Sequence, residues 1–535
     1  MNEQLYVKPN VRLEPMFNRW YAWANLIPPS TAAMYVANHH LPLMRSYVAN
    51  PKVHAAAVKN PAMRGGPFID HGGQRVNEVQ ELVQETVAHC GPMLEFAESV
   101  KFLDEMLRNE ARGGSLEPLY ARVPENLRGY VELVYDLNNN PSIRFLESLL
   151  YRSGFYLPKC QSLALSLIEQ DYRPFVLSTP ILPSEDRLHL PLTFEDEAVD
   201  EFARMKERPM PSSYLNELLN VNGRDEELLS SFLTTEAPPP PQRYEGDAVR
   251  IRYFGHACIL IEAAGVSILT DPAISYKYPS DTSRYTYQDL PPEIDYVLIS
   301  HNHQDHVLFE TLLQIRHKVR NLVVPRGGNG ALQDPSLNLL LRHTGFRNIV
   351  ELDELDSIPI PGGEIVGLPF FGEHADLDVR TKIAHLVRVK GRSILCAADS
   401  CNVEPLLYER VHELYGDVDV LFLGMECSGA PLTWLYGPYL TKPLDRKHDQ
   451  ARRLAGSNYE RSIDLARRLN CEQIYVYAMG QEPWLTYISS LQYTEESYAI
   501  VESNKLIQDC REHGRVSERL YAEKELFLKR REIFL

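Results

Sequence analysis

The chain has 535 residues, 44% of them hydrophobic and 24% charged, which is typical of a soluble globular enzyme. This length exceeds one ordinary hydrophobic core, so we expect roughly two to four domains. The excess of 72 acidic over 55 basic side chains argues against a nucleic-acid-binding surface.

The amino terminus, residues 1–15, has no basic leader followed by an apolar core. No stretch of the chain approaches the roughly 20 apolar residues that span a membrane. The eight cysteines are scattered without a CxxC pair, which predicts reduced and mostly buried thiols. We therefore predict a cytoplasmic protein that binds neither nucleic acid nor membrane.

Apolar residues recur at helix spacing in the first part of the chain. One such stretch runs from Val76 to Val87 after Gly72 and Gly73, and another from Leu127 to Tyr135. Four consecutive prolines, Pro238 to Pro241, then stiffen the chain into an extended spacer. We predict a mainly helical N-terminal domain over residues 1–243 that ends in this linker.

Short β-like runs follow the prolines, with helical stretches between the later ones. They comprise a hairpin within 249–274 that turns at 263–265, and the segments 294–300, 321–325, 393–400, 418–424 and 473–480. This order favours a layered α/β domain with buried sheets over residues 244–535. Residues 495–511 predict a C-terminal helix over a sheet face, and the RGGNG segment at 326–330 predicts a plain loop.

The segment HNHQDH, residues 301–306, follows the apolar run that ends at Ser300. Residues two apart in an extended loop point the same way. His301 and His303 can therefore bind one metal ion while Asp305 and His306 reach a second. Four metal-binding side chains in six positions indicate a metal site at the end of a strand.

HNHQDH resembles the signature of the metallo-β-lactamase superfamily, and residues 253–275 resemble the opening strands of that fold. The resemblance covers residues 248–485 and implies an α/β fold, an αββα sandwich after the helical domain. It also implies that Asp271 orients a ligand histidine, since metal-bound imidazoles need tautomer control.

The superfamily normally adds a third histidine to the first metal, a bridging Asp or Cys, and a final histidine on the second metal. Asp399 follows an apolar strand where the bridge is expected. Glu373 stands where a histidine is expected, with His374 next to it, and residues 479–482 after the last strand contain no histidine.

These departures indicate the metal. The predicted ligands are His301, His303, Asp305, His306, Glu373 and Asp399. Such a carboxylate-rich set suits iron and oxygen chemistry better than zinc hydrolysis. We predict Glu373 and Asp399 as the catalytic residues, with Asp399 as a bridge and Glu373 able to switch between one-oxygen and two-oxygen binding.

Within the superfamily the chain resembles the diiron β-hydroxylases typified by the enzyme of chloramphenicol biosynthesis. Its length, its helical first domain, Glu373 and the segments 424–440 and 477–484 are similar to that group. The resemblance implies a monooxygenase that hydroxylates the β-carbon of an amino acid held as a thioester on a nonribosomal peptide synthetase thiolation domain, in natural-product biosynthesis.

The same resemblance implies two Fe ions bridged by oxo or hydroxo and by Asp399, with O2 as co-substrate. His301, His303 and Glu373 would share one iron with Asp399, and Asp305 and His306 the other. No flavodoxin-like or ferredoxin-like segment is visible, so an external electron donor or reductase is expected. The N-terminal domain is expected to form a homodimer.

Other residues near the predicted site have two interpretations each. Glu426 and Cys427 follow a strand at the expected site edge, and Trp434, Tyr436 and Tyr439 form either an aromatic wall around a substrate or a core insert. Glu482 is either a group that supports the metal site or the start of a helix. Two basic segments, 316–320 and 446–453, are either docking sites for an acidic carrier domain or solvated helix faces.

Two other function classes remain open. A dizinc hydrolase of lactone, phosphodiester or acyl-amide substrates would use the same first motif, with a metal-bridging hydroxide as nucleophile. A non-catalytic scaffold with a decayed site is disfavoured, because the whole first motif and Asp399 are present.

Overall fold

Two seven-stranded mixed sheets form the C-terminal part of the computed structural model, which describes residues 4–489 and 491–530. The first sheet has the order β15-β14-β13-β12-β11-β10-β23. Its strands are β10 (Val249–Gly255), β11 (Cys258–Ala263), β12 (Val266–Thr270), β13 (Ile294–Leu298), β14 (Val319–Pro325), β15 (Ile349–Leu352) and β23 (Lys524–Leu528). The second sheet has the order β16-β17-β18-β19-β20-β21-β22. Its strands are β16 (Ser357–Ile360), β17 (Gly363–Leu368), β18 (Ala384–Val389), β19 (Arg392–Cys396), β20 (Val420–Gly424), β21 (Gln473–Tyr477) and β22 (Val516–Arg519).

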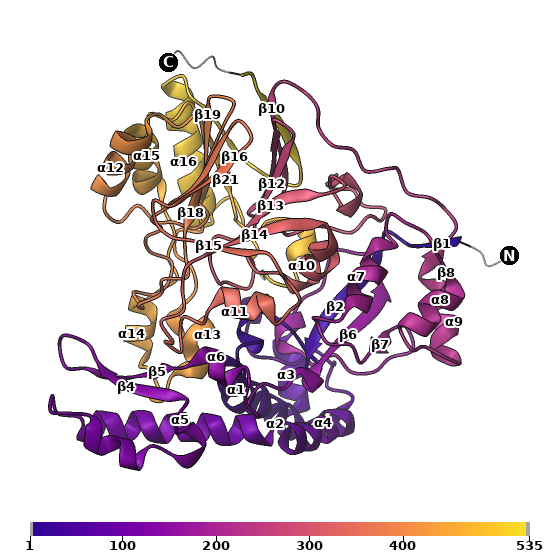
Figure 1. The fold of residues 1–535 in the computed structure, drawn as a ribbon, viewed down its shortest axis with the longest axis vertical. Helices are drawn as coiled ribbons and strands as arrows, with labels where there is room; N and C mark the ends of the chain where they lie inside the picture. Colours follow the sequence, from indigo (N-terminus) through magenta and orange to yellow (C-terminus); the bar gives the residue numbers. More distant parts are fainter. Residues whose placement is uncertain (1–3, 490, 531–535) are drawn as a thin grey trace.

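The two sheets pack against each other through one apolar core. Ile251 and Val323 of the first sheet and Val387 and Phe422 of the second belong to the same buried cluster. Helices cover the outer faces: α10 (Phe309–Ile315), α11 (Leu337–Arg342), α12 (Leu406–Tyr415), α15 (Tyr459–Arg468) and α16 (Tyr498–Glu512). In Figure 1, α12, α15 and α16 lie together beyond β19 and β21, and α10 lies on the opposite side, beyond β13 and β14. This is the predicted αββα sandwich, and the predicted C-terminal helix is confirmed as α16.

Strand direction brings the ends of several strands to one edge. Strands β10, β12 and β13 run the same way, because β11 is antiparallel to both β10 and β12 while β12 and β13 are parallel. In the second sheet β17, β19, β20 and β21 likewise share one direction. Polar side chains that follow these strands therefore meet at one edge, as the carboxyl ends of parallel strands do.

The N-terminal part combines helices with a small sheet of order β3-β2-β6-β7. Its strands are β2 (Val11–Phe17), β3 (Trp20–Tyr21), β6 (Gln161–Leu167) and β7 (Leu188–Leu190). Its helices are α1 (Pro29–Tyr35), α2 (Leu41–Ala49), α3 (Pro51–Ala57), α4 (Val76–His89), α5 (Gly91–Glu110), α6 (Glu147–Leu150), α7 (Glu197–Arg204), α8 (Ser212–Leu218) and α9 (Arg224–Ser231). Helices α1 to α5 gather at one end of the molecule in Figure 1. The helix predicted from Val76 is confirmed as α4.

The prediction of a second N-terminal helix, over the stretch from Leu127 to Tyr135, is wrong. Residues Val131–Tyr135 form strand β4, which pairs with β5 (Pro141–Phe145) in an antiparallel hairpin. Three consecutive asparagines supply the turn, where Asn139 adopts a φ of 60°, a conformation that asparagine tolerates. The apolar spacing in this stretch fits a helix and a strand equally, and the turn residues decide between them.

A buried ion network joins the two parts of the chain. Arg173 donates to Glu14 on β2 at 3.0 Å and to Glu310 on α10 at 3.0 Å. Its guanidinium also lies 4.2 Å from the ring centre of Tyr487. These contacts connect β2 to a helix that covers the first sheet, so the N-terminal part is held against the sandwich.

The first basic segment is not a docking surface. Arg316 is buried and lies 2.9 Å from Asp200 on α7, and Lys318 is buried against Glu207. Both cations therefore hold the N-terminal part to the sandwich, and the interpretation of Arg316 and Lys318 as part of a carrier-binding patch is wrong; Arg320 is exposed but pairs with Glu293 at 2.5 Å.

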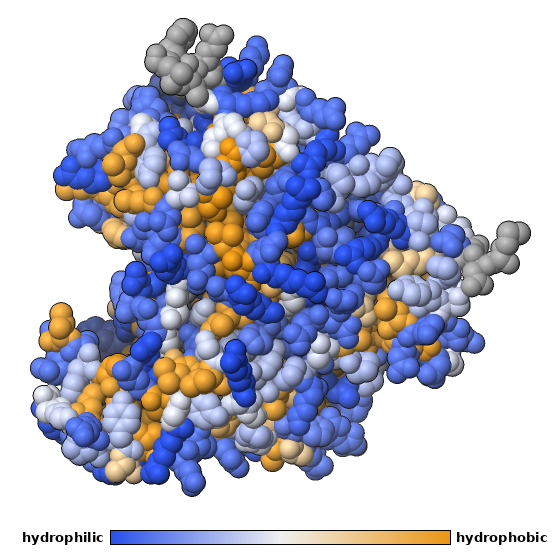
Figure 2. All heavy atoms as spheres, viewed as in Figure 1, coloured by the Kyte–Doolittle hydropathy of each residue, from blue (hydrophilic) through white to orange (hydrophobic). Residues whose placement is uncertain are grey.

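All eight cysteines are free, as predicted, and seven of them are buried. Within residues 4–489 and 491–530, no helix is long and apolar enough to cross a membrane. Hydrophilic side chains cover most of the face drawn in Figure 2, which is notched between the region of α12 and α15 and the region of β4 and β5.

The buried carboxyl group of Glu147, in the N-terminal part, should make the free energy of unfolding depend on pH. Burial raises the pKa of Glu147 to about 7, against the smaller opposing effect of the Ser336 N–H that its carboxylate accepts. The pKa of Glu147 is thus higher in the folded protein than its value near 4.5 in the unfolded chain. The folded state has its full stability below pH 4.5, and it loses stability as the pH rises towards 7 and the buried carboxyl group ionises. Glu147→Gln should therefore gain about 1–3 kcal/mol over wild type between pH 4.5 and 8. Thermal unfolding of both proteins across this range measures the gain, and a constant difference would contradict it.

Candidate metal centre

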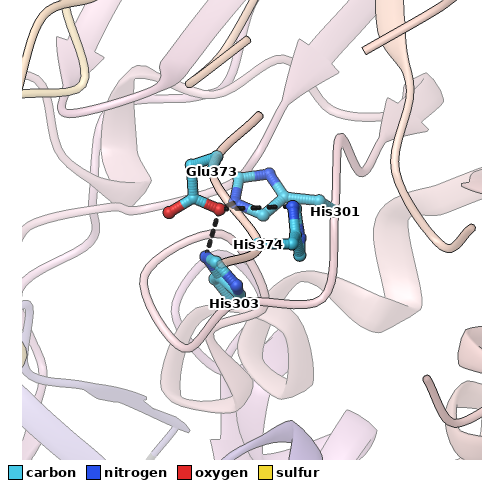
Figure 3. Close-up of side chains that lie close together, drawn as sticks. All are labelled: His301, His303, Glu373 and His374. Atoms are coloured by element: carbon cyan, nitrogen blue, oxygen red, sulfur yellow. Dashed lines mark ion pairs between the residues drawn. The ribbon is translucent and has the colours of Figure 1, made fainter. Parts of the chain in front are cut away.

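Four side chains converge at the common strand edge, on the side of the HNHQDH loop. His301, His303, Glu373 and His374 place potential ligand atoms within 4.8 Å of one another, and all four are buried. Glu373 Oε2 lies 2.9 Å from His303 Nδ1 and 3.6 Å from His301 Nε2. Figure 3 shows the three imidazoles arranged around the Glu373 carboxylate. One carboxylate thus faces several nitrogen donors.

Two further groups adjoin this one. His256, Asp305 and His306 form the first, in which His256 Nε2 lies 3.2 Å from Asp305 Oδ2. His301, His306 and Asp399 form the second, with 3.0 Å between His306 Nε2 and Asp399 Oδ2. Because His301 and His306 each belong to two groups, the three groups make one continuous donor set. All six predicted ligands lie in this set.

The strand ends explain this convergence. His256 follows β10, and the HNHQDH loop follows β13. Glu373 comes after β17 and Asp399 after β19. Glu373 has a φ of 66°, in the left-handed region that non-glycine residues rarely adopt. Gly424 is required because a Cβ there would lie 2.5 Å from Asp399 Oδ1.

The donor set fits metal ions. Buried ligand-type atoms without a hydrogen-bond partner gather here: both ring nitrogens of His256, Nε2 of His301, His303 and His374, Oε2 of Glu373 and Oδ1 of Asp399. Unpaired buried polar atoms are costly unless another group satisfies them. Cations coordinated at this point would satisfy both the nitrogens and the carboxylates.

Electrostatics at the site agree with this. Burial raises the pKa of Glu373, and the charges of Asp399 and Asp305 raise it further. Burial alone would lower the pKa of His306, yet the carboxylates of Asp305, Asp399 and Asp271 raise it well above its usual value. The carboxylates therefore repel one another and attract cations, which is the condition that a pair of metal ions relieves.

Asp271 forms a hydrogen bond with the ring nitrogen of His306 that faces away from Asp399. Its Oδ2 lies 2.8 Å from His306 Nδ1, and its two oxygens accept hydrogen bonds from the N–H and the hydroxyl of Ser300 at 2.7 and 2.6 Å. Nδ1 of His306 is thereby engaged, and Nε2 faces Asp399. This geometry matches the orienting role that the resemblance implies for Asp271.

Replacing Asp271 tests that orientation. We expect Asp271→Ala to lower metal affinity and activity about 10- to 100-fold, as loss of a hydrogen-bonding partner behind a histidine ligand typically does. Competition with a chelator, followed by metal analysis of the recovered protein, measures the change. Unaltered metal retention would show that Ser300 and the backbone suffice to orient His306.

Two histidines of the site lie outside the predicted ligand set. One is His374, which follows Glu373 in the chain, and the other is His256. It lies in the turn between β10 and β11 with a φ of 52°, beside Asp305 and His306. The available signal was its position directly after a strand parallel to β13. Glu482, by contrast, accepts a hydrogen bond from the Tyr253 hydroxyl and belongs to none of the three donor groups found among the described residues.

A cavity of about 700 Å³ opens onto the donor set. Its polar wall includes His303, Asp305, Glu373, Asp399 and Glu426, and its apolar wall includes Trp434, Leu435, Ile488, Leu491 and Tyr493. Arg64 of the N-terminal part and Arg453 also line it. Such a cavity, apolar with a few convergent polar groups, is typical of a substrate site.

The predicted aromatic wall is only partly present. Trp434 lines the cavity and is 45% exposed. Tyr436 and Tyr439 are buried in the core, where Tyr439 packs edge-to-face against Tyr35 of α1. The core-insert interpretation therefore holds for these two tyrosines.

Residues 6–238 match the family described as diiron non-heme beta-hydroxylase N-terminal domain, and residues 250–425 match the beta-lactamase superfamily domain. A 4-amino-L-phenylalanyl-[CmlP-peptidyl-carrier-protein] 3-hydroxylase of Streptomyces venezuelae is 38% identical over 534 residues, covering 98% of this chain and 99% of that protein. The sequence similarity thus extends over both parts of the chain.

Solved structures agree. The crystal structure of CmlA, a diiron beta-hydroxylase from Streptomyces venezuelae, matches with a TM-score of 0.93 and 37% identity, over 99% of this chain and 100% of that one. The full-length match to the CmlA structure confirms the predicted fold class.

A shorter sequence match also exists. An uncharacterised protein of Mycobacterium tuberculosis is 31% identical over 151 residues, 24% of this chain and 39% of its own length.

Proposed function

The chain belongs to the diiron non-haem β-hydroxylase family, and on this premise we propose that it hydroxylates the β-carbon of a carrier-bound amino acid. The amino acid would be held as a thioester by the thiolation domain, or peptidyl carrier protein, of a nonribosomal peptide synthetase. The observation that carries the proposal is the buried set of histidines and carboxylates at the floor of a cavity with apolar walls.

We assign the ligands as follows. His301, His303 and Glu373 would hold one iron, Asp305 and His306 the other, and Asp399 both. The supporting contacts are those from Glu373 to His303 and from His306 to Asp399, at 2.9 and 3.0 Å. His256 and His374 are additional nitrogen donors in the same set.

When bound, the iron pair would activate O2 with two electrons from an external donor. The overall reaction takes the substrate C–H group, O2, two electrons and two protons to C–OH and water. Asp271 would keep His306 in one ring orientation. The buried floor and the apolar walls would keep bulk water away from the reacting carbon.

The dizinc hydrolase is the weaker alternative. Three of the six assigned ligands are carboxylates, Asp305, Glu373 and Asp399, and hard oxygen ligands of this kind favour iron over the nitrogen-rich sites of zinc hydrolases. The family comparison supports a hydroxylase as well.

The proposal is tested by single-turnover and steady-state assays on a loaded carrier. The purified protein, a chemical reductant and isotopically labelled O2 would be incubated with 4-amino-L-phenylalanyl thioester on a peptidyl carrier protein. Mass spectrometry should show one labelled oxygen in the acyl group. Release of free amino acid without oxygen incorporation would support hydrolysis instead.

Docking of the carrier is proposed at the second basic segment. Helix α14 (Arg446–Ala451) is exposed at Arg446 and Lys447, and carrier domains usually present an acidic helix. We expect Arg446→Glu with Lys447→Glu to raise the KM for the loaded carrier about 10-fold at low salt while kcat is retained. An unchanged KM would remove this surface from the proposal.

Three further expectations belong to this proposal. The reductant would come from a separate protein, because neither domain resembles an electron carrier. The chain would form a homodimer through residues 1–243, which light scattering of the full chain would detect as a mass of two chains. Its eight free thiols favour the cytoplasm, where such thiols stay reduced.

A further inference from the structure

Glu426 differs from the other acids that line the central cavity. Four carboxylates line it, and three of them contact histidines of the donor set: Asp305, Glu373 and Asp399. The side-chain carboxylate of Glu426 makes no hydrogen bond or ion pair to any residue within 4–489 and 491–530, and it belongs to none of the three donor groups identified there. It is therefore a half-buried carboxylate that has no partner among these residues.

The backbone holds Glu426 firmly beside the metal donors. It follows β20, whose last residue, Gly424, donates from its N–H to the carbonyl of Ala398 at 2.8 Å, one residue before Asp399. Behind it, the Glu426 carbonyl accepts from the Ser428 N–H at 2.7 Å, and Arg453 donates to the carbonyl of Ser428 at 2.8 Å. The backbone that carries the Glu426 side chain is thus held in place beside Asp399.

An enclosed carboxylate without a partner favours a cationic ligand group. The proposed substrate carries one such group, the α-ammonium of the aminoacyl thioester, two bonds from the β-carbon. Binding the ammonium at Glu426 would direct the β-carbon towards the neighbouring donor set. The apolar wall of Trp434, Leu435 and Ile488 would remain for the rest of the acyl group.

Resting on the proposed function, we propose that Glu426 binds the free α-ammonium of the carrier-bound amino acid and selects for it. Two classes of acyl carrier are then poor substrates: those that lack the amine and those whose amine is already acylated. The reaction must consequently precede N-acylation or peptide-bond formation at that amino acid, and must follow the reaction class that forms aminoacyl thioesters.

The test compares three loaded carriers with wild type and Glu426→Gln. The acyl groups are 4-amino-L-phenylalanyl, its N-acetyl derivative and 3-(4-aminophenyl)propanoyl, which lacks the α-amine. Wild type should prefer the first by about 100-fold in kcat/KM over either analogue, because a desolvated carboxylate left unpaired is costly. Glu426→Gln should lose most of this activity and reduce the preference to within about 5-fold. Glu496→Gln, which removes an exposed carboxylate in the segment bordering the cavity, should behave as wild type.

The outcomes separate the inference from the proposed function. If Glu426→Gln keeps the wild-type preference, or loses iron in proportion to its activity, Glu426 does not act by binding the ammonium and the inference is overturned. If wild type neither binds nor hydroxylates any of the three carriers, the proposed function itself fails, and the inference fails with it. Calorimetric titration with each carrier under anaerobic conditions supplies the binding readout without turnover.

Discussion

Replacing Asp399 with asparagine is expected to reduce hydroxylation by more than about 100-fold, because losing a bridging ligand should cost more than the roughly 10- to 100-fold of losing a group that only supports a ligand. Asp399 connects the two halves of the donor set, since its carboxylate lies 3.0 Å from His306 and 3.8 Å from His301. An amide cannot bridge two cations as a carboxylate does, and it does not offset their charge. The iron content of the purified variant should fall together with its activity.

The matched control is Asp378→Asn, which removes an exposed carboxylate close to Glu373 in sequence. This control should retain full iron content and activity. Iron analysis and the loaded-carrier assay would be run on wild type and both variants. An Asp399→Asn protein with wild-type iron content and activity would contradict the assignment of Asp399 as the bridging residue.

The second large effect concerns stability. Arg173→Met should destabilise the protein by about 3–5 kcal/mol, because it leaves the buried Glu310 without its counter-charge, whereas Glu14 keeps Arg12 and Arg187. Arg173 and its partners Glu14 and Glu310 are all less than 10% exposed. Glu310 would keep the Tyr21 hydroxyl at 3.0 Å as a donor but would lose both guanidinium contacts. The shift would appear in the denaturant midpoint.

Two comparisons make this result specific. Arg224→Met removes an exposed ion pair with Glu185, 2.9 Å apart, and should leave the midpoint unchanged. The double variant Arg173→Met with Glu310→Gln should regain part of the lost stability, since it removes the carboxylate that lost its counter-charge. If Arg173→Met unfolds at the wild-type midpoint, the network does not hold the N-terminal part to the sandwich.

Much of the sandwich could be predicted from the sequence, because its strands are buried on both faces. Segments such as 294–300 and 418–424 are nearly continuous apolar runs, and their polar ends mark one sheet edge. HNHQDH, Glu373 and Asp399 stand at such ends, so the sequence, with the family resemblance, could predict that these side chains lie close together. The structure brings all six together.

Other features depend on distant neighbours that the sequence does not reveal. His256 joins the site because β10 runs parallel to β13, which depends on the register of an intervening antiparallel strand. Arg316 and Lys318 look like an exposed basic patch, but they pair with Asp200 of α7 and with Glu207 of the turn after it, more than a hundred positions earlier in the chain. In β4 the apolar spacing fits two structures, and three asparagines decide the outcome.

Metal analysis combined with an ultraviolet–visible spectrum, on protein purified without added metal, tests the central claim most directly. The assigned ligands, three carboxylates and three histidines, predict about two irons per chain and the absorption of an oxo-bridged ferric pair. A colourless protein containing stoichiometric zinc would contradict the diiron assignment.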